Sequence, residues 1–133
     1  MGTLRKSFRK LLSDSRGARR RKAQREVSLI VGITVGEGAN TELLTGRTKD
    51  LSETGLSMSL PIDRGQRELL TEGAKVRVLL VLPMKTVNIK AEVVHSHSLD
   101  ELDPDKGQLI GVHILQMSSE DEEYYSEYLA LLK

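Results

Sequence analysis

The 133-residue chain contains no cysteine. This absence excludes a disulfide framework and a zinc site built on thiolate ligands, and it fits a reducing compartment. The sequence also lacks any apolar run near the roughly 18 residues of a membrane span. No apolar segment of the kind found in secretory signals follows the basic start of the chain. We therefore expect a cytoplasmic protein without disulfide bonds.

Aromatic residues are scarce, with one phenylalanine, three tyrosines and no tryptophan. Proteins that bind single-stranded nucleic acid commonly stack its bases on aromatic side chains, so this scarcity argues against nucleic acid as a partner. The sequence also lacks a nucleophile elbow, and the segment of residues 36–38 (GEG) lacks the strand-to-helix context of a phosphate-binding loop. We expect a protein that is not an enzyme and holds no cofactor.

Candidate metal ligands are few. His95 and His97 lie two residues apart, hence on one face of a strand, and His113 is placed to lie on a neighbouring strand. Three imidazoles are able to bind zinc, but neither cysteine nor a spaced carboxylate pattern accompanies them. We interpret these histidines as solvated or core residues, with no metal site.

Charge is distributed unevenly, although the formal net charge is only +1. Residues 1–25 hold ten of the 20 lysines and arginines and one of the 19 acidic residues, so this segment carries +9 and the remainder carries −8. Such asymmetry predicts a basic arm on an acidic body. The arm is expected to meet an anionic partner, and nucleic acid, a membrane surface, an acidic protein face and a nucleotide all qualify.

Residues 3–12 are expected to form a short amphipathic helix within this arm. Leu4, Phe8, Leu11 and Leu12 recur at helical spacing, and the basic residues fall off that stripe. We favour burial of the stripe on the rest of the chain or on a partner. Contact with the inner face of a membrane is the alternative, because a basic amphipathic helix suits an anionic lipid surface.

Residues 13–18 are small and polar and are expected to link the N-terminal segment, residues 1–18, to one domain of residues 19–133. From Val27 onward the hydrophobic period changes from helical to two, which predicts strands. Turn signals separate six such runs with few helices between them, which is typical of an antiparallel barrel or sandwich. The expected strands cover residues 27–35, 41–51, 56–60, 76–82, 87–95 and 109–117.

Two helical segments are expected. The connection between the third and fourth strands includes a helical turn near residues 67–70. The chain ends in a helix that Ser119 and Glu122 begin as a capping box, and we expect this helix to cover an open end or a flank of the sheet. Its apolar stripe comprises Tyr125, Tyr128, Leu129 and Leu132.

Two short motifs carry the candidate chemistry. Residues 21–25 (RKAQR) have the form R-x-x-x-R, and residues 50–55 (DLSETG) have the form D-x-S-x-x-G at the turn between the second and third strands. With the strand count and the terminal helix, these motifs resemble the PilZ domain family over residues 19–130. Residues 109–114 (LIGVHI) also resemble the glycine-bearing last strand of that family. The resemblance implies an all-β, six-stranded antiparallel barrel with a C-terminal helix that binds the bacterial second messenger cyclic di-GMP.

The resemblance also implies roles for the motif residues. Arg21 and Arg25 are expected to contact guanine and phosphate, because an arginine fork bonds guanine O6 and N7 together and forms charge-assisted bonds to phosphate. Asp50 and Ser52 are expected at the other guanine edge, with Gly55 at the floor of the site. The alternatives are a solvated basic run for the arginines, turn capping for Asp50 and Ser52, and a structural turn glycine.

Arg20 immediately precedes the first motif. In the family an additional arginine at this place is able to hold a second, stacked dinucleotide, so we expect Arg20 among the ligand contacts and two ligands per chain. The expected function is a cyclic di-GMP receptor whose basic arm changes conformation on binding and passes the signal to a downstream protein. Two alternatives stay open: a PilZ-like interaction module without a ligand, and a binder of membrane surfaces or nucleic acid acting through the arm.

Overall fold

The computed structural model describes residues 24–36, 41–100, 102 and 106–132. The expected helix of residues 3–12, the linker of residues 13–18, and the candidate ligand contacts Arg20 and Arg21 lie outside the described residues. Within the described part, no helix is both long and apolar enough to cross a lipid bilayer.

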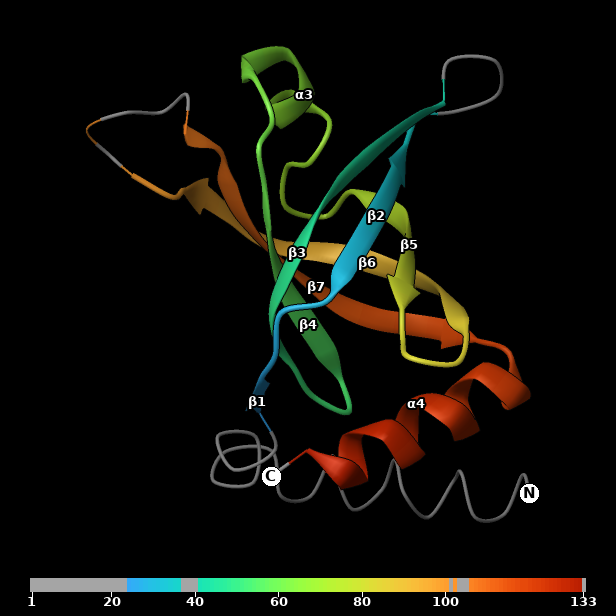
Figure 1. Cartoon of the computed structure of the whole chain (residues 1–133). Coiled ribbons are helices and arrows are strands. Elements are labelled where there is room, and N and C mark those ends of the chain that lie inside the picture. The colour runs from blue at the N-terminus through green and yellow to red at the C-terminus, as the bar shows by residue number, and fades with distance from the viewer. Residues whose placement is uncertain (1–23, 37–40, 101, 103–105, 133) are drawn as a thin grey trace.

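Six strands close into an antiparallel barrel (Figure 1). Around the barrel the order is β3-β2-β5-β6-β7-β4, and β4 pairs with β3 to complete the ring. The two-residue strand β1 pairs with the far end of β3. The expected six-stranded barrel with a C-terminal helix is therefore confirmed. The elements are β1 (Arg25–Glu26), β2 (Ile30–Val35), β3 (Glu42–Leu51), β4 (Gly55–Leu60), α3 (Arg64–Glu68), β5 (Lys75–Val81), β6 (Thr86–Ser98), β7 (Gln108–Met117) and α4 (Ser119–Leu131).

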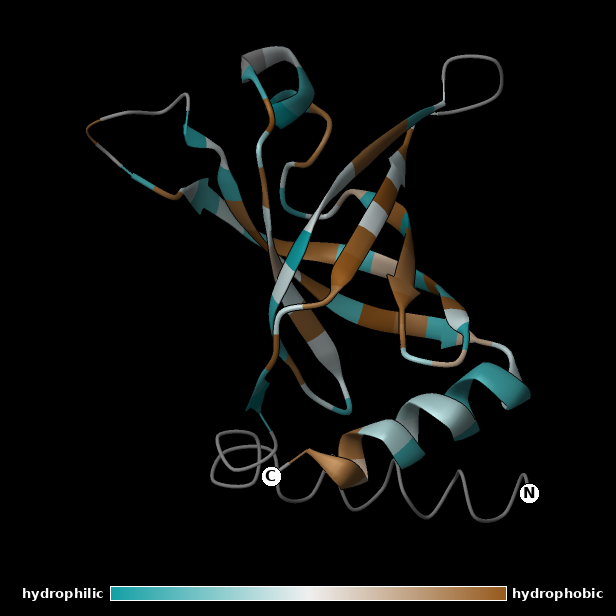
Figure 2. Cartoon of the chain, in the orientation of Figure 1, coloured by the Kyte–Doolittle hydropathy of each residue, from teal (hydrophilic) through white to brown (hydrophobic). Residues whose placement is uncertain are grey.

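The alternation of apolar and polar residues along each strand builds the core. On β4, Leu56, Met58 and Leu60 point inward and are almost completely buried, and residues at the same period fill the barrel from the other strands. Figure 2 shows hydrophobic residues along the strands, interleaved with polar ones. Because the apolar alternates occupy the interior, the polar alternates face outward, and a binding site made by strand residues must lie on the outside of the barrel.

The first predicted strand is interrupted in the structure. The sequence predicted one strand over residues 27–35, whereas β1 and β2 are separated at residues 27–29. The buried Thr48 side chain explains the interruption: its hydroxyl donates to the Val27 carbonyl and accepts from the Leu29 N–H at 2.9 Å. The Thr48 side chain thus bonds the carbonyl and N–H groups that would otherwise continue the hydrogen bonding between the strands.

Both helices begin earlier than predicted. Helix α3 starts at residue 64, because Asp63 caps it: the Asp63 side chain accepts from the Gln66 N–H, and the Gln66 side chain accepts from the Asp63 N–H. The N-cap of α4 is Ser118, whose hydroxyl accepts from the Asp121 N–H at 3.1 Å, so the predicted cap at Ser119 is wrong by one residue. The predicted apolar stripe of α4 does face the barrel, with Tyr125 and Leu129 buried and Tyr128 and Leu132 packed beside them.

Helix α4 lies across one end of the barrel, at the opposite end from α3 (Figure 1). Lys85, in the turn between β5 and β6, pairs with Asp121 at 2.8 Å and Glu120 at 3.3 Å. Asp121 also accepts from the Asn88 N–H at 3.0 Å. The hydrogen bond between the two side chains raises the pKa of Lys85 and lowers the pKa of Asp121. These contacts fix the N-terminal end of α4 to the β5–β6 turn.

Candidate ligand-binding site

The second motif forms the tight turn that joins β3 to β4. The Ser52 N–H donates to the Gly55 carbonyl at 2.8 Å. The Ser52 hydroxyl donates to the same carbonyl at 3.1 Å and accepts from the Gly55 N–H at 3.2 Å. Ser52 is buried, and its side chain closes this turn. Turn capping, one of the two roles considered for Ser52, is therefore present in the structure.

Gly55 is required by close packing and not by an unusual backbone angle. Among the described glycines, only Gly36, Gly73 and Gly107 have a positive φ. A Cβ atom at Gly55 would lie 2.4 Å from the carbonyl oxygen of Val112 on β7. The motif glycine thus lets β4 pair closely with β7, which is a structural role.

A surface pocket of about 360 Å³ lies beside this turn, on the outside of the barrel. Three of the predicted ligand contacts, Asp50, Ser52 and Gly55, line it. Gln24, inside the R-x-x-x-R motif, lines it as well, so the end of the basic arm meets the motif turn here. The other lining residues are Thr54 of the turn and residues of β4, β6 and β7, which include Ser57, His95, Gly111 and His113.

Four lining residues form one row across four neighbouring strands. Asp50 on β3 pairs with Ser57 on β4, Ser57 pairs with Gly111 on β7, and Gly111 pairs with His95 on β6. Directly opposed residues of antiparallel strands point to the same face. All four therefore belong to the outer surface, and they form the floor of the pocket.

A β-bulge at each end of the row turns Asp50 and His95 toward this surface. The pairing of β3 with β4 shifts between Thr48 and Asp50, so the buried Thr48 faces inward while Asp50 faces outward. The pairing of β6 with β7 shifts between Val93 and His95 in the same way. Simple alternation along the predicted strand of residues 87–95 would place His95 on the same face as the buried Val93, but the bulge turns His95 outward. Bulges commonly re-aim side chains beside functional sites.

The His95 imidazole lies directly over Gly111. A Cβ atom at Gly111 would fall 2.1 Å from His95 Nε2, so only glycine leaves room for the ring. The ring also stacks on His97, with centroids 5.7 Å apart and an interplanar angle of 26°. In the described part of the chain, no three histidine, aspartate or glutamate side chains gather as metal ligands would.

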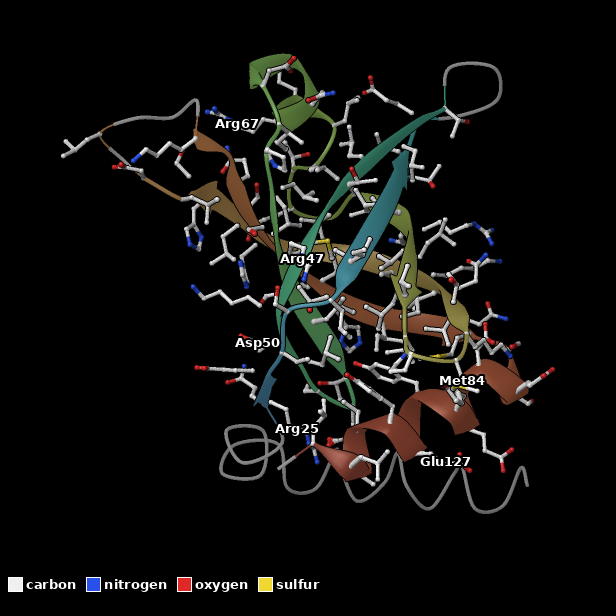
Figure 3. The ribbon with its side chains drawn as sticks, viewed as in Figure 1. Arg25, Arg47, Asp50, Arg67, Met84 and Glu127 are labelled. Carbon is white, nitrogen blue, oxygen red and sulfur yellow. The ribbon has the colours of Figure 1, made fainter. Side chains whose placement is uncertain are left out.

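Arg25 lies beside the pocket and is held by other partners. Its Nη1 donates to Glu53 Oε1 at 2.8 Å and to Glu53 Oε2 at 3.3 Å, and its Nε donates to the Leu132 carbonyl at 3.2 Å. Figure 3 shows Arg25 next to the C-terminal end of α4, on the same flank as Asp50. Glu53 occupies a variable position of the second motif, and sequence reasoning assigned it no role.

Tyr125 links α4 to the same turn. Its hydroxyl donates to the Ser52 carbonyl at 2.7 Å, and burial of the side chain raises the pKa of this phenol well above 10.0. The C-terminal half of α4 therefore contacts both motifs, through Tyr125 at the turn and through the bond from Arg25 to Leu132. The turn that lines the pocket is therefore joined to this helix by a hydrogen bond.

Sequence reasoning therefore found part of the pocket. The motif pattern identified Asp50, Ser52 and Gly55, which the fold brings together, and Arg25, which the fold holds next to them on Glu53. It missed Ser57 and His95. Ser57 carried one usable signal, because it is polar and two residues after Gly55, hence on the same face of the strand.

The family model described as the PilZ domain matches residues 19–131 of this chain. No curated protein matches the sequence. Among solved structures, the PilZ domain of YcgR from Escherichia coli, solved with c-di-GMP, aligns with a TM-score of 0.63 and 14% identity, over 82% of this chain and 87% of that one. Likenesses at this identity show the fold alone.

Two longer proteins align to a similar extent. The inhibitor of motility MotI (DgrA) of Bacillus subtilis has a TM-score of 0.61 at 13% identity, over 81% of this chain and 48% of that one. MrkH of K. pneumonia in its apo state has a TM-score of 0.61 at 16% identity, with the same coverage of 81% and 48%. This chain thus spans about half the length of MotI and of MrkH.

Proposed function

The chain belongs to the PilZ domain family, and from this premise we propose that it is a receptor for cyclic di-GMP. The observation that carries the proposal is the pocket of about 360 Å³, which Asp50, Ser52 and Gly55 line together with Gln24 from the arginine motif. Support also comes from the PilZ domain of YcgR, whose structure was solved with c-di-GMP. We propose a binding function, without catalysis.

The chemistry of the two motifs suits the two kinds of group in this ligand. The Asp50 carboxylate accepts hydrogen bonds only, which matches the N1–H and N2–H donors of guanine. Arg21 and Arg25 supply planar forks that pair with guanine O6 and N7 and with the phosphates. The positive charge of residues 1–25 favours an anionic ligand at this end of the barrel.

Arg25 makes the proposed receptor a switch. In the structure its guanidinium is engaged by Glu53 and by the last turn of α4. A ligand phosphate competes for the same guanidinium, and capture of Arg25 breaks the contacts to Glu53 and Leu132. The basic arm then closes over the ligand while the end of α4 is released, which changes the surface offered to a downstream protein partner. Arg20 adds charge for a second, stacked dinucleotide.

Isothermal titration calorimetry with cyclic di-GMP tests the receptor function. We expect binding at micromolar or tighter affinity, with two ligands per chain at saturation. Arg21→Ala and Asp50→Ala are each expected to lower the affinity by about 1–3 kcal/mol, the range for a good bidentate base contact. Arg77→Ala is the matched control, because Arg77 lies on β5 and bonds Asn88 outside the pocket. Absence of heat with the wild type at high ligand concentration rejects the receptor function.

A further inference from the structure

Ser57 is a buried polar group that the fold leaves without a partner. Its side chain lies on the outward face of β4, yet the residue is only 9% exposed. Its Oγ has no hydrogen-bond partner within the described part of the chain. Burying a hydroxyl without a partner costs free energy, so such a group needs an explanation.

The position of Ser57 in the pocket supplies the explanation. Ser57 lines the pocket and lies between Asp50 on one side and Gly111 on the other. Gly111 has no side chain to offer a bond. The Ser52 hydroxyl, by contrast, is already hydrogen-bonded within the turn, to the carbonyl and the N–H of Gly55. Ser57 is therefore a pocket hydroxyl that remains available to a ligand.

We propose that Ser57 is a ligand-contacting residue that reads the nucleobase beside Asp50. The inference rests on the proposed function and assigns a base-selecting role within that site. Cross-strand partners on one face have Cβ atoms about 5 Å apart, so one edge of a base can meet both side chains. The His95 imidazole fills the space over Gly111, so the base lies on the Asp50 side of Ser57.

The pairing of a carboxylate with a hydroxyl selects guanine. The Watson–Crick edge of guanine carries the N1–H and N2–H donors next to the acceptor O6. Asp50 accepts from the donors, and the Ser57 hydroxyl, which is able to donate, bonds O6. Adenine places the acceptor N1 opposite the Asp50 carboxylate, where two acceptors face each other. The row therefore favours guanine over adenine.

The test titrates cyclic di-GMP and, in parallel, cyclic di-AMP, which differs only in its bases. Ser57→Ala is expected to weaken cyclic di-GMP binding about tenfold and to narrow the preference over cyclic di-AMP. Ser59→Ala is the matched control, because Ser59 lies on the same face of β4 but outside the pocket lining, and its binding should equal that of the wild type. Wild-type affinity and selectivity in Ser57→Ala overturn the inference alone. Failure of the wild type to bind overturns the receptor function as well.

Thermal unfolding of the free protein gives a second, independent readout. If the hydroxyl has no partner in the free protein, Ser57→Ala should keep or raise the Tm, because the variant removes an unpaired buried group. The increase in Tm caused by cyclic di-GMP should at the same time become smaller. A lower Tm for free Ser57→Ala would mean that the hydroxyl has a partner within the protein, and this result contradicts the inference.

Discussion

At the scale of single residues, the proposed switch depends on the partners of Arg25. The Arg25 and Glu53 side chains are 22% and 12% exposed, so their ion pair is partly sheltered from water. A receptor that must release this pair before Arg25 reaches a phosphate binds less tightly than one in which Arg25 is free. In the proposed receptor, Glu53 competes with the ligand for Arg25, and it lies in the same turn that supplies Asp50 and Ser52.

Replacing Glu53 should strengthen ligand binding. Glu53→Gln keeps the shape of the side chain and removes its charge, so Arg25 leaves it more readily. We expect the affinity for cyclic di-GMP to rise roughly fivefold, equivalent to about 1 kcal/mol for a partly exposed ion pair. Glu120→Gln is the control, because Glu120 pairs with Lys85 at the other end of α4. Equal affinities of Glu53→Gln and the wild type in calorimetry would show that Arg25 does not exchange partners.

At the scale of elements, the arm and α4 are the parts expected to respond. Residues 13–25 carry six basic side chains and one acidic one, so the proposed switch relies on an anionic ligand to offset the repulsion between them. In the proposed switch, ordering of the arm draws on the binding free energy. The barrel strands are held by continuous ladders and should change little.

Hydrogen exchange measured by mass spectrometry tests this division. With cyclic di-GMP, protection should rise in residues 13–25 and 50–55, because the ligand bridges the two motifs. Protection at the last turn of α4 should fall, because the Leu132 carbonyl loses its bond from Arg25 and the turn is then held less firmly. Residues 78–81 of β5 serve as the internal control. Equal protection of the arm with and without ligand would indicate a preformed site and rule out the switch.

Local periodicity predicted the elements well, and side-chain hydrogen bonds to the backbone account for two of the errors. The period-2 pattern located all six barrel strands, and the apolar stripe located α4 and its buried face. The break before β2 was missed, because it depends on the Thr48 hydroxyl bonding residues 19 and 21 positions away. The start of α3 was misplaced, because the Asp63 capping box was overlooked.

Local motifs predicted part of the lining of the pocket, and the residues that depend on strand register were missed. Asp50, Ser52 and Gly55 lie within six residues of sequence, so their pattern was visible. Ser57 and His95 join them only through the pairing of β4, β7 and β6. The bulge at Val93–His95 reverses the face that simple alternation assigns to His95. Glu53 was missed as the partner of Arg25, because the two residues are 28 positions apart and their contact leaves no local pattern in the sequence.

At the scale of the whole molecule, the closed barrel keeps its hydrophobic core apart from the surface pocket. The apolar residues of six strands fill the interior, and the pocket lies outside, where β3, β4, β6 and β7 run side by side. A ligand on this surface does not have to enter or disturb the core. The barrel with α4 corresponds to about half the length of MotI and of MrkH.

The most direct test of the account is a cyclic di-GMP titration of the labelled protein followed by two-dimensional amide NMR. The proposed function predicts saturable shifts of the amides of Gln24, of residues 50–57 and of residues 111–113, which line the pocket or adjoin residues that line it. The amide signals of residues 78–81, on β5, should not shift. Absence of saturable shifts, or shifts confined to surfaces away from these residues, would contradict the account.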